Sequence, residues 1–423
     1  MIIGGVRTPF IKSFGDLIRV DTIGLGVAAV RGLLKRIPIS ENEIDSVVWG
    51  GVVLPSTSVN IGREILFDLG FPPTIEATTV TRACTTSLKA ITLAAAAIER
   101  GDADVVIAGG SDSISNAEIK LPASLLHKIA PVFMSSKSGP VDYLKLLFNI
   151  NPLKDLIPQR PAVRERTTGE LMGESAEKMG IRNMISREAQ DAFAVQSHLR
   201  AAEAVESGRF ADEVVPVDVP GGKRVLSDGI IRGDASVKKL AKLKPAFSKG
   251  GTLTAGNSSP LTDGASASLL MSEEKARTLG FAPLAAFRSW SFDAVDPADQ
   301  MLMGPALSMP RAAAKAGMEL KDFDLIDIHE AFAAQVLSVL KMLASDKFAE
   351  VNLGRKRAFG EIDPKNINVH GGSIAIGHPF AATGSRMVTT IARELKLTGK
   401  ATALLGICGA GGVSAGAVLE SVI

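Results

Sequence analysis

Two short apolar runs, each followed by paired glycines, most constrain what this chain can fold into. The first lies in residues 104–110 and the second in residues 402–412. Uninterrupted apolar runs of this length are typical of strands that are buried on both faces of a helix-covered sheet. A helical pattern precedes each run, so the two halves repeat one order of helix, strand and glycine turn. We interpret the chain as an α/β protein with a weak internal duplication.

The elements around these runs follow the same pattern. Residues 46–50 predict a strand, and a helix with a continuous apolar face begins after Cys84 and ends at Gly101. That face is formed by Leu88, Ile91, Ala95 and Ile98. In the C-terminal part we expect strands at 325–328, 402–407 and 413–420 and a helix at 383–395.

The bulk composition excludes some classes of protein. The 423 residues, of 44.3 kDa and 46% hydrophobic, exceed what one simple core needs, so we expect two or three structural units in a globular, soluble protein. The 47 basic and 45 acidic residues nearly balance, which gives a net charge of +2 and no general attraction to nucleic acid. We therefore expect no nucleic-acid binding.

The cysteines and the N-terminus bear on the compartment. Cys84 and Cys408 are the only two cysteines and form no disulfide framework, which fits a reducing compartment. We expect the cytoplasm, or a mitochondrial-type matrix in a eukaryote. The N-terminus lacks a basic region followed by a long apolar core, and no stretch reaches the roughly 18 apolar residues of a membrane span. Secretion and integral membrane insertion are not expected.

Residues 120–250 differ in character from the parts on either side. Prolines interrupt their short apolar runs at positions 122, 131, 140, 152, 158 and 161, and residues 120–166 carry eight lysines and arginines against three acidic residues. We therefore predict an inserted loop domain at 120–250. It separates an N-terminal half, 1–119 completed by 251–275, from a C-terminal half, 276–423. The basic insertion is a candidate for covering a phosphate-rich ligand, or for docking a partner subunit or a membrane surface.

Both cysteines occupy positions that suit a reactive sulfur. Cys84 stands just before a predicted helix, where unpaired backbone N–H groups and the helix dipole lower the pKa of a thiol. Cys408 ends a strand before the glycine-rich residues 409–412, whose N–H groups can face a ligand closely. For each cysteine the alternative is a small buried residue that packs in an α/β core. Neither spacing suits a metal site, and we predict none.

Two histidines complete a set of reactive groups. His378 lies between Gly377 and Pro379, on a stiff turn from which an imidazole can approach a thiol as a general base. His329 follows a predicted strand and opens a helix, so it can donate to an oxyanion or hold a water. Glu330 beside it suits the first turn of a helix through the dipole, with a catalytic role as the alternative. A nucleophile, a base and a second proton carrier together favour carbon–carbon bond cleavage by a thiol.

The remaining histidines have weaker signals. His370 can line a ligand tunnel or pack there, and His127 and His198 are expected on the solvated surface. A histidine with no motif around it is better explained by packing or solvation than by chemistry.

Four blocks of this chain resemble the signature blocks of the thiolase family. They are residues 82–84, 329–332, 371–379 and 408–412, and they match in order and spacing. The likeness extends from Val6 to Glu420, essentially the whole chain. It implies the thiolase fold, a duplicated core in five alternating layers, α/β/α/β/α, with an inserted loop domain.

The resemblance also implies a role for each reactive group. Cys84 is expected to become acylated, His378 to activate it, and Cys408 to act as acid and base at the α-carbon of acetyl-CoA and at the thiol of incoming coenzyme A. One oxyanion hole is expected from His378 and His329. The second is expected from the backbone N–H groups of Cys84 and Ala410.

Coenzyme A enters this interpretation as a substrate, and the resemblance implies no separate cofactor. Arg232 is expected near its nucleotide and Ser259 on its pantetheine, with Met172 and Phe332 as apolar walls. The insertion is expected to cover the bound coenzyme.

Within the family the chain is most similar to the 3-ketoacyl-CoA thiolase subunits of fatty-acid β-oxidation complexes, the trifunctional type. His329 is the first reason, because biosynthetic acetoacetyl-CoA thiolases usually have asparagine there, and residues 257–264 and 377–384 point the same way. Leu171 replaces a histidine of the short-chain enzymes, which favours a longer acyl chain. The likeness implies a homodimer or a dimer of dimers, and it makes an enoyl-CoA hydratase and 3-hydroxyacyl-CoA dehydrogenase subunit a candidate partner.

Three alternatives remain open. They are an acetoacetyl-CoA (biosynthetic) thiolase, a β-ketoacyl synthase, and a thiolase-like protein that binds acyl-CoA without catalysis. A synthase pairs its cysteine with two histidines, which His329 and His378 could imitate, but it needs no second thiol to take an α-proton. Cys408 therefore argues against a synthase, and the intact set of Cys84, His378 and Cys408 argues against a non-catalytic protein.

Overall fold

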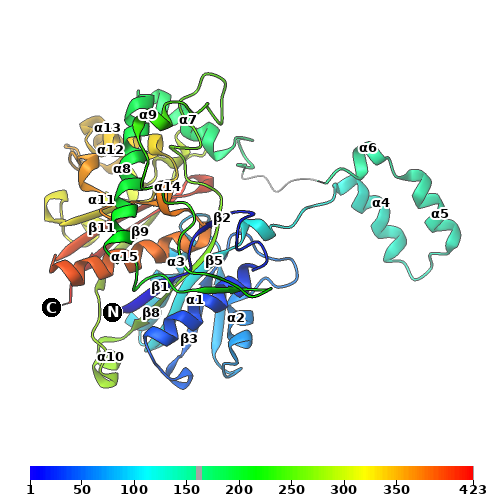
Figure 1. Cartoon of the computed structure of the whole chain (residues 1–423), viewed down its shortest axis with the longest axis horizontal. Coiled ribbons are helices and arrows are strands. Elements are labelled where there is room, and N and C mark those ends of the chain that lie inside the picture. Colours follow the sequence, from blue (N-terminus) through cyan, green and yellow to red (C-terminus); the bar gives the residue numbers. More distant parts are fainter. Residues whose placement is uncertain (159–163, 423) are drawn as a thin grey trace. The chain divides into compact units, whose positions relative to one another are not determined.

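The computed structural model of the protein describes residues 1–158 and 164–422, and Figure 1 shows its helices and strands. The chain forms two compact units. The larger unit is made of Met1–Asn116 and Arg164–Ile423, and the smaller is Ala117–Val163. Residues 164–250 pack with the larger unit, so the separate body is shorter than the predicted insertion of 120–250.

A six-stranded sheet forms the N-terminal half of the larger unit. Its strands follow the order β1 (Ile2–Arg7), β8 (Thr262–Met271), β5 (Val105–Asp112), β3 (Ser46–Gly50) and β4 (Glu76–Val80), and the short β2 (Ile11–Lys12) pairs with β8. Strand β3 is parallel to β4 and β5, whereas β8 is antiparallel to β1 and β5. Strand β5 is buried along its whole length, as its unbroken apolar sequence predicts.

A four-stranded sheet forms the C-terminal half. Its order is β10 (Leu325–Ile328), β11 (Thr402–Cys408), β12 (Val413–Glu420) and β9 (Ala286–Ala294). Strands β10 and β11 are parallel, and β12 is antiparallel to β11 and β9. The first sheet shows the same pattern of strand directions along β3, β5, β8 and β1, where the first pair is parallel and the next two pairs are antiparallel. The two sheets thus repeat one arrangement, as the internal duplication in the sequence predicts.

Two helices form the central layer between the sheets. Helices α3 (Thr86–Glu99) and α15 (Thr383–Thr398) share one hydrophobic core, in which Leu88 and Ile91 of α3 lie with Met387 of α15. Both sheets contribute to this core, the first through Val106 and Ala108 and the second through Leu405 and Ile407. The apolar face predicted for the helix after Cys84 is therefore the face that fixes the two halves together.

Further helices cover the outer faces of the sheets. Helices α1 (Thr22–Arg36) and α2 (Ile61–Leu69) pack on the first sheet, and α11 (Pro305–Lys315) and α12 (Ala333–Leu343) pack on the second. The five layers α/β/α/β/α are confirmed. The other elements of the larger unit are α7 (Met172–Arg182), α8 (Arg187–Glu206), α9 (Val237–Leu240), α10 (Glu273–Leu279), α13 (Asp346–Leu353), α14 (Ser373–Ile376), β6 (Val217–Val219) and β7 (Lys223–Val225).

The smaller unit is helical. It contains α4 (Ala123–Phe133), α5 (Pro140–Asn149) and α6 (Pro152–Asp155). Pro140 and Pro152 occupy first helical positions, where the missing N–H removes no helical hydrogen bond, so these prolines begin helices rather than only interrupting apolar runs. The carboxylate of Asp155 accepts hydrogen bonds from Lys128, Ser124 and the backbone of Asn151, which lowers its pKa to about 2 and ties α6 to α4.

The central layer gives a stability prediction. Replacing Ile91, which is fully buried in the shared core, by alanine is expected to cost about 2–5 kcal/mol of unfolding free energy, because it leaves a cavity between the sheets. Leu93→Ala on the same helix is the matched control, since that side chain is 37% exposed and should cost about 1 kcal/mol or less. Urea denaturation midpoints measure both. Equal losses for the two variants would contradict the central position of α3.

Candidate active site

Two parallel strands place His329 and Cys408 at one edge of the second sheet. Strands β10 and β11 run in register with Ile328 opposite Gly406, so both of their carboxyl ends lie at this edge. The backbone N–H of His329 donates to the Gly406 carbonyl at 2.8 Å, and Cys408 is the last residue of β11. Helix α12 begins only at Ala333, so His329 lies in the turn after the strand and does not open the helix as expected.

The turn that carries Cys84 is anchored to the other half of the protein. The Arg82 guanidinium donates to the backbone carbonyls of Ser414 and Asp293, at 2.9 and 3.0 Å, on strands β12 and β9. Ala83 has a φ of 47°, a left-handed conformation that is uncommon for a residue other than glycine. Cys84 then directly precedes Thr85, the residue that caps α3, as the sequence predicts.

The turn that carries His378 is fixed on both sides. Gly377 has a φ of 113°, and a Cβ there would lie 2.8 Å from Ile230 and 2.9 Å from Thr262, so the turn requires glycine. The backbone N–H of His378 donates to Thr262 Oγ1 at 3.0 Å. The backbone N–H of Ala381 donates to the Asp112 carboxylate at 2.6 Å. These bonds hold the imidazole against the N-terminal half.

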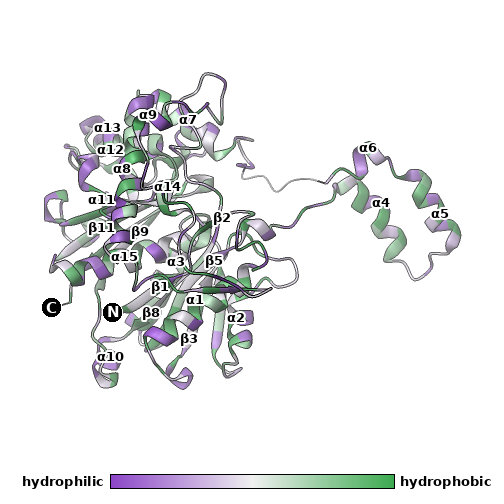
Figure 2. Cartoon of the chain, in the orientation of Figure 1, coloured by the Kyte–Doolittle hydropathy of each residue, from purple (hydrophilic) through white to green (hydrophobic). Residues whose placement is uncertain are grey.

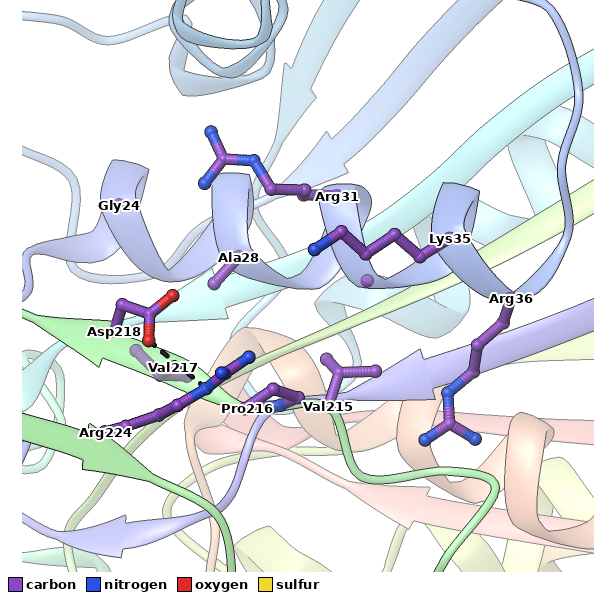
Figure 3. Close-up of a pocket in the computed structure, with 11 residues that line it drawn as sticks. Gly24, Ala28, Arg31, Lys35, Arg36, Val215, Pro216, Val217, Asp218 and Arg224 are labelled. Carbon is purple, nitrogen blue, oxygen red and sulfur yellow. Dashed lines mark ion pairs between the residues drawn. The ribbon is translucent and has the colours of Figure 1, made fainter.

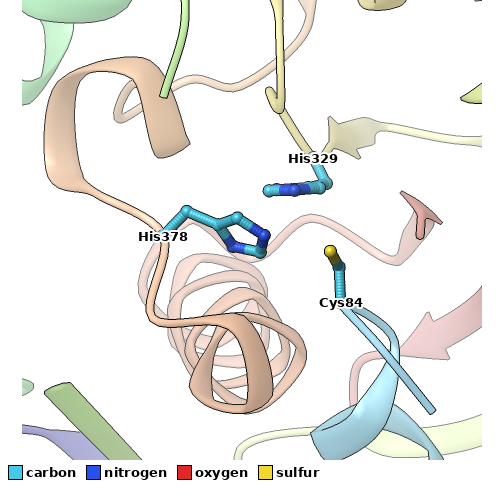
Figure 4. Close-up of side chains that lie close together, drawn as sticks. All are labelled: Cys84, His329 and His378. Carbon is cyan, nitrogen blue, oxygen red and sulfur yellow. The ribbon is translucent and has the colours of Figure 1, made fainter. Parts of the chain in front are cut away.

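Cys84, His329 and His378 meet in one cluster. The cysteine sulfur and one nitrogen of each ring all lie within 4.8 Å of one another, and the two ring centroids are 4.2 Å apart. Each Nδ1 contacts a hydroxyl, whereas both Nε2 atoms are buried and have no hydrogen-bond partner in the part of the chain that the structure describes. Figure 4 shows the two rings and the sulfur converging from three separate segments. The cluster therefore has a thiol and two imidazole nitrogens free to act on a ligand.

Cys408 and Ala410 lie beside this cluster. The backbone N–H of Ala410 hydrogen-bonds to the Cys84 sulfur, and the Cys84 N–H also interacts with it. Cys408 is buried and close enough to Cys84 for the two thiols to affect each other's ionisation. The backbone groups expected to form the second oxyanion hole thus face the reactive sulfur, and both thiols border one region.

Burial keeps all of these groups uncharged. Burial raises the pKa of the Cys84 thiol to about 11, an effect larger than the opposing hydrogen bond from Ala410. The expectation of a lowered thiol pKa is therefore wrong for the resting protein. Burial, followed by the charge of Arg386, lowers the pKa of His378 to about 3, and burial raises the pKa of Cys408 well above its ordinary value. A thiol and a neutral imidazole thus face each other, and a thiolate forms only as His378 accepts the proton.

Glu330 has a structural role that the sequence did not reveal. It precedes α12, so the expected stabilisation by a helix dipole is wrong. Its buried carboxylate accepts hydrogen bonds from Ser197 at 2.7 Å, Asn368 at 2.7 Å and the backbone of Ile374 at 3.2 Å. Burial raises the pKa of this carboxyl, and the bonds oppose that effect. Glu330 thus ties the turn after β10 to the loop that leads to His378.

Other functional contacts were also missed. Asp112 accepts bonds from the backbones of Val52 and Val53 as well as Ala381, so one carboxylate joins two loops at the reaction centre. The sequence did carry a signal for this role of Asp112, because an acidic residue ends an apolar strand just after Gly109 and Gly110. Ser373, Thr383 and Arg386, which surround the two imidazoles, carry no such signal, because hydroxyls in a glycine-rich turn and an arginine in a helix are ordinary in sequence.

The residues expected to bind coenzyme A are spread around the centre. Met172 and Phe332 pack in the hydrophobic cluster that contains Cys408, where Phe332 meets Phe247 edge to face with ring centroids 5.7 Å apart. The Ser259 N–H donates to the Ala331 carbonyl next to Phe332. Arg232 is exposed, and its backbone is held at two points: its N–H donates to His198 Nδ1 at 3.3 Å, and its carbonyl accepts from the Ala235 N–H at 3.2 Å. The coenzyme roles of these residues stay predictions.

The three other histidines have different surroundings. His127 is exposed as expected, but His198 is only 5% exposed, so its expected place on the solvated surface is wrong. It lies on α8 under the Arg232 loop, and burial lowers its pKa to about 4. His370 Nε2 faces Glu394 Oε2 at 2.8 Å, and its ring meets Phe210 edge to face. Packing is therefore the better interpretation of His370.

Two other features are candidate functional sites: a surface hollow away from the reactive cluster, and the cluster itself as a metal site. A hollow of about 200 Å³ lies between α1 and the β6–β7 pair (Figure 3). Beside it, Arg36 donates to the carbonyls of Ala211 and Val214, and Arg224 pairs with Asp218. It shares no residue with the reactive cluster. Within the described residues, the cluster of Cys84 with the two histidines has the donor types of a zinc site. The expectation that no metal is resident stays a prediction.

The ionisation state of Cys84 can be tested by alkylation. Because the pKa of Cys84 is raised to about 11, its thiolate fraction is small at neutral pH and grows about tenfold per pH unit. The iodoacetamide rate at Cys84, followed by peptide mass spectrometry from pH 6 to 9, should therefore rise without a plateau. A plateau already reached below pH 7 would show a preformed thiolate–imidazolium pair and contradict the assignment.

Asp112→Asn tests the anchor of the His378 turn. An asparagine can still accept from Val52 and Val53, but its NH₂ faces the Ala381 N–H, so that bond is lost and turnover should fall by about 10- to 100-fold. Glu177→Gln is the control, because this buried carboxylate also accepts bonds from backbone N–H groups, those of Thr252 and Leu253, away from the cluster. Steady-state kinetics and thermal unfolding compare the two. Equal turnover in both variants would rule out the anchoring role.

Comparison with known proteins agrees with this geometry. The thiolase N-terminal domain model matches residues 1–274, and the thiolase C-terminal domain model matches residues 281–421. The 3-ketoacyl-CoA thiolase of Shewanella halifaxensis is 44% identical over 421 residues, which are 99% of this chain and 96% of that protein. The 3-ketoacyl-CoA thiolase of Yersinia pestis is 44% identical over 422 residues, with the same coverage.

Solved structures show the same similarity. The Bacillus anthracis acetyl-CoA acetyltransferase has a TM-score of 0.83 and 32% identity, covering 100% of this chain and 98% of that one. Human mitochondrial 3-ketoacyl-CoA thiolase has a TM-score of 0.82 and 28% identity, with the same coverage. The family models cover both halves of the chain, and the layers and the reactive cluster are those that the signature blocks imply. The chain belongs to the thiolase family.

Proposed function

We propose that this protein is a 3-ketoacyl-CoA thiolase, which uses coenzyme A to cleave a 3-ketoacyl-CoA into acetyl-CoA and an acyl-CoA shortened by two carbons. The observation that carries the proposal is the meeting of the Cys84 sulfur with His378 and His329 within 4.8 Å, beside a second buried thiol, Cys408. The relatives named 3-ketoacyl-CoA thiolase, 44% identical over almost the whole chain, support it.

In the first half of the reaction, the Cys84 sulfur attacks the C3 keto carbon while His378 Nε2 takes the thiol proton. Both groups start neutral, so the proton moves together with the attack and no charge is stored in the resting site. The C2–C3 bond then breaks, and its electron pair leaves on acetyl-CoA as an enolate. Cys408 protonates the α-carbon of that enolate. The acyl chain remains on Cys84 as a thioester.

In the second half, the thiol of incoming coenzyme A attacks the thioester carbon. Cys408, now a thiolate, takes the proton from coenzyme A, and the Cys84 sulfur leaves and recovers its proton from His378. The Ala410 and Cys84 N–H groups, which already face the Cys84 sulfur, stabilise the oxyanion of this thioester. The other oxygen, that of the acetyl-CoA enolate, accepts from Nε2 of His329 and from Nε2 of His378, which carries the thiol proton at that stage.

Two other activities use similar parts. A β-ketoacyl synthase makes its carbanion by losing CO₂, so the second buried thiol next to Cys84 favours thiolysis over decarboxylative condensation. An acetoacetyl-CoA thiolase would run the same chemistry on the shortest chain, and the Bacillus anthracis acetyl-CoA acetyltransferase is among the structurally similar proteins. His329 and Leu171 favour a longer chain. Rates over a series of 3-ketoacyl-CoA chain lengths decide between them, and a maximum at four carbons would overturn the longer-chain assignment.

Variants of the two thiols separate their roles. Cys84→Ser should lower thiolysis by about 10³-fold or more and abolish acetyl-enzyme formation from acetyl-CoA. Cys408→Ala should retain one acetyl group per chain on Cys84, seen by mass spectrometry, but lose deuterium exchange at the α-carbon of acetyl-CoA. Acetyl transfer to Cys408, or unchanged exchange in the Cys408 variant, would contradict the assignment.

We also propose that the protein works as a homodimer or a dimer of dimers in a reducing compartment, the cytoplasm or a mitochondrial-type matrix. Both cysteines are free thiols. Strand β4 lies at the end of the first sheet. Among the described residues, no strand pairs with its outer side, so a second copy of the chain could use this edge. Light scattering of the purified protein measures the oligomeric state.

The smaller unit, Ala117–Val163, is the proposed docking element, and its surface favours an anionic lipid surface over a partner subunit. On α5, Val141, Leu144 and Phe148 follow a spacing of three and four residues and are exposed, so an apolar helix face is open to solvent. Phe148 is 85% and Met134 86% exposed, and Lys120, Lys137, Lys145 and Lys154 lie in the same unit. Figure 2 shows hydrophobic stretches along α4 and α5. Among the described residues, no helix has the length and apolar character needed to cross a membrane.

Vesicle sedimentation tests this docking. The full chain should bind vesicles with anionic lipid more than neutral ones, and Met134→Ser with Phe148→Ser should reduce binding about 10-fold or more. Val351→Ser, which removes a similarly exposed apolar side chain from the larger unit, is the control. Unchanged binding in the double variant, or binding only to a hydratase and dehydrogenase subunit, would overturn the lipid proposal while leaving thiolysis intact.

A further inference from the structure

Each imidazole of the reactive cluster contacts one hydroxyl group through its Nδ1 atom. Ser373 Oγ lies 2.9 Å from His329 Nδ1, and Thr383 Oγ1 lies 2.6 Å from His378 Nδ1. Both Nε2 atoms are left facing the cluster without a partner. A neutral imidazole carries one proton, so the hydroxyl on Nδ1 decides whether Nε2 donates or accepts a hydrogen bond.

The surroundings of Ser373 determine the atom to which its hydroxyl donates a hydrogen bond. The guanidinium of Arg386 donates to Ser373 Oγ at 3.2 Å, and an arginine cannot accept a hydrogen bond in return. Among the described residues, His329 Nδ1 is the only acceptor in reach of the Ser373 hydroxyl proton. If Nδ1 carried the proton of the ring, the buried Ser373 hydroxyl would have no acceptor. The ring therefore accepts at Nδ1 and keeps its proton on Nε2.

We propose that Ser373, oriented by Arg386, is a positioning residue that holds His329 in the tautomer with its proton on Nε2, so that this ring donates to the enolate oxygen of acetyl-CoA. The inference rests on the proposed thiolase function for the identity of that oxygen. The tautomer itself follows from the contacts alone.

The contrast with His378 supports the assignment. The Thr383 hydroxyl has a second acceptor, the Pro379 carbonyl at 3.4 Å, to which it can donate while it accepts from His378 Nδ1–H. His378 can then present the lone pair of Nε2 to the Cys84 thiol, as a general base must. Two adjacent histidines with opposite tautomers give one donor and one acceptor. The ring centroids are 4.2 Å apart, so the donor and the acceptor can act on the same substrate.

The guanidinium of Arg386 contacts Ser373, and its charge acts on both rings by lowering their pKa. Its guanidinium is 1% exposed and lies 3.8 Å from the Asp327 carboxylate, which offsets its charge. Burial, then His378 and Arg386, lower the pKa of His329 well below its ordinary value, so the ring is neutral at neutral pH and its tautomer matters there. A metal ion needs a lone pair from each of its ligands. A proton on His329 Nε2 occupies the lone pair of that atom, so only Cys84 and His378 keep one in the cluster. The cluster is therefore a poorer zinc site.

The tautomer can be read directly by nitrogen NMR of the full-length protein labelled with ¹⁵N-histidine. The chain has 5 histidines, and His329→Asn identifies the signals of this ring. We expect a protonated Nε2 and an unprotonated Nδ1 in the unmodified protein, and a shift toward a mixture in Ser373→Ala. Protonation at Nδ1 in the unmodified protein would overturn the inference. Because no substrate is present, this result is independent of the proposed function.

Kinetics test the consequence for turnover. Ser373→Ala should lower kcat by about 10-fold with little change in KM, less than the 10²- to 10³-fold typical of losing a whole oxyanion donor. In the His329→Asn background the same substitution should have no further effect, because an asparagine amide has no tautomer to select. An equal loss in both backgrounds would mean that Ser373 acts only on structure, and that result would reject the inference.

Ser338→Ala provides the matched control. This serine is fully buried on α12, and its hydroxyl has no hydrogen-bond partner among residues 1–158 and 164–422. Its removal should therefore change neither kcat nor the His329 signals. If the unmodified protein lacks thiolysis altogether, the proposed function fails while the NMR assignment still stands or falls by itself.

Discussion

The parallel pairing of β10 with β11 is the constraint on which the reaction centre depends. It brings the turn after Ile328 and the end of β11 to one sheet edge, so His329 and Cys408 meet although they are distant in sequence. The central helices α3 and α15 then fix the N-terminal half against this edge through one shared core. Arg82 completes the connection, because its guanidinium spans from the Cys84 turn to strands of the second sheet. Catalytic geometry in this protein is therefore a product of how its two halves pack.

Desolvation gives the assembled groups their chemistry. Burial keeps the Cys84 and Cys408 thiols protonated and the His378 and His329 rings neutral. A cluster without fixed charge can accept charge that develops on a substrate oxygen, provided that its donors already point at that oxygen. Hydrogen bonds rather than ion pairs orient the rings here, through Ser373 and Thr383. The same burial that makes the resting thiol weakly acidic thus keeps competing water and counter-charges away from the reacting carbon.

The sequence predicted the fold and the main groups because their signals are local. Strands such as β5 and β11 are unbroken apolar runs, and the two cysteines and His378 lie in distinctive glycine-rich segments that match one family. Properties created by packing were not predictable in this way. The raised pKa of Cys84 depends on what covers it, His198 is buried by a loop more than 30 positions away, and Glu330 bonds Ser197 and Asn368 from distant segments. Local reasoning about helix dipoles and surface position therefore failed for these three residues.

A crystal structure of the protein after reaction with acetyl-CoA tests the central claim most directly. The account predicts an acetyl group on the Cys84 sulfur, with its carbonyl oxygen within hydrogen-bond distance of the Ala410 and Cys84 N–H groups and with the Cys408 sulfur facing its methyl carbon. An acetyl group on Cys408, or a carbonyl oxygen directed away from those N–H groups, would contradict it.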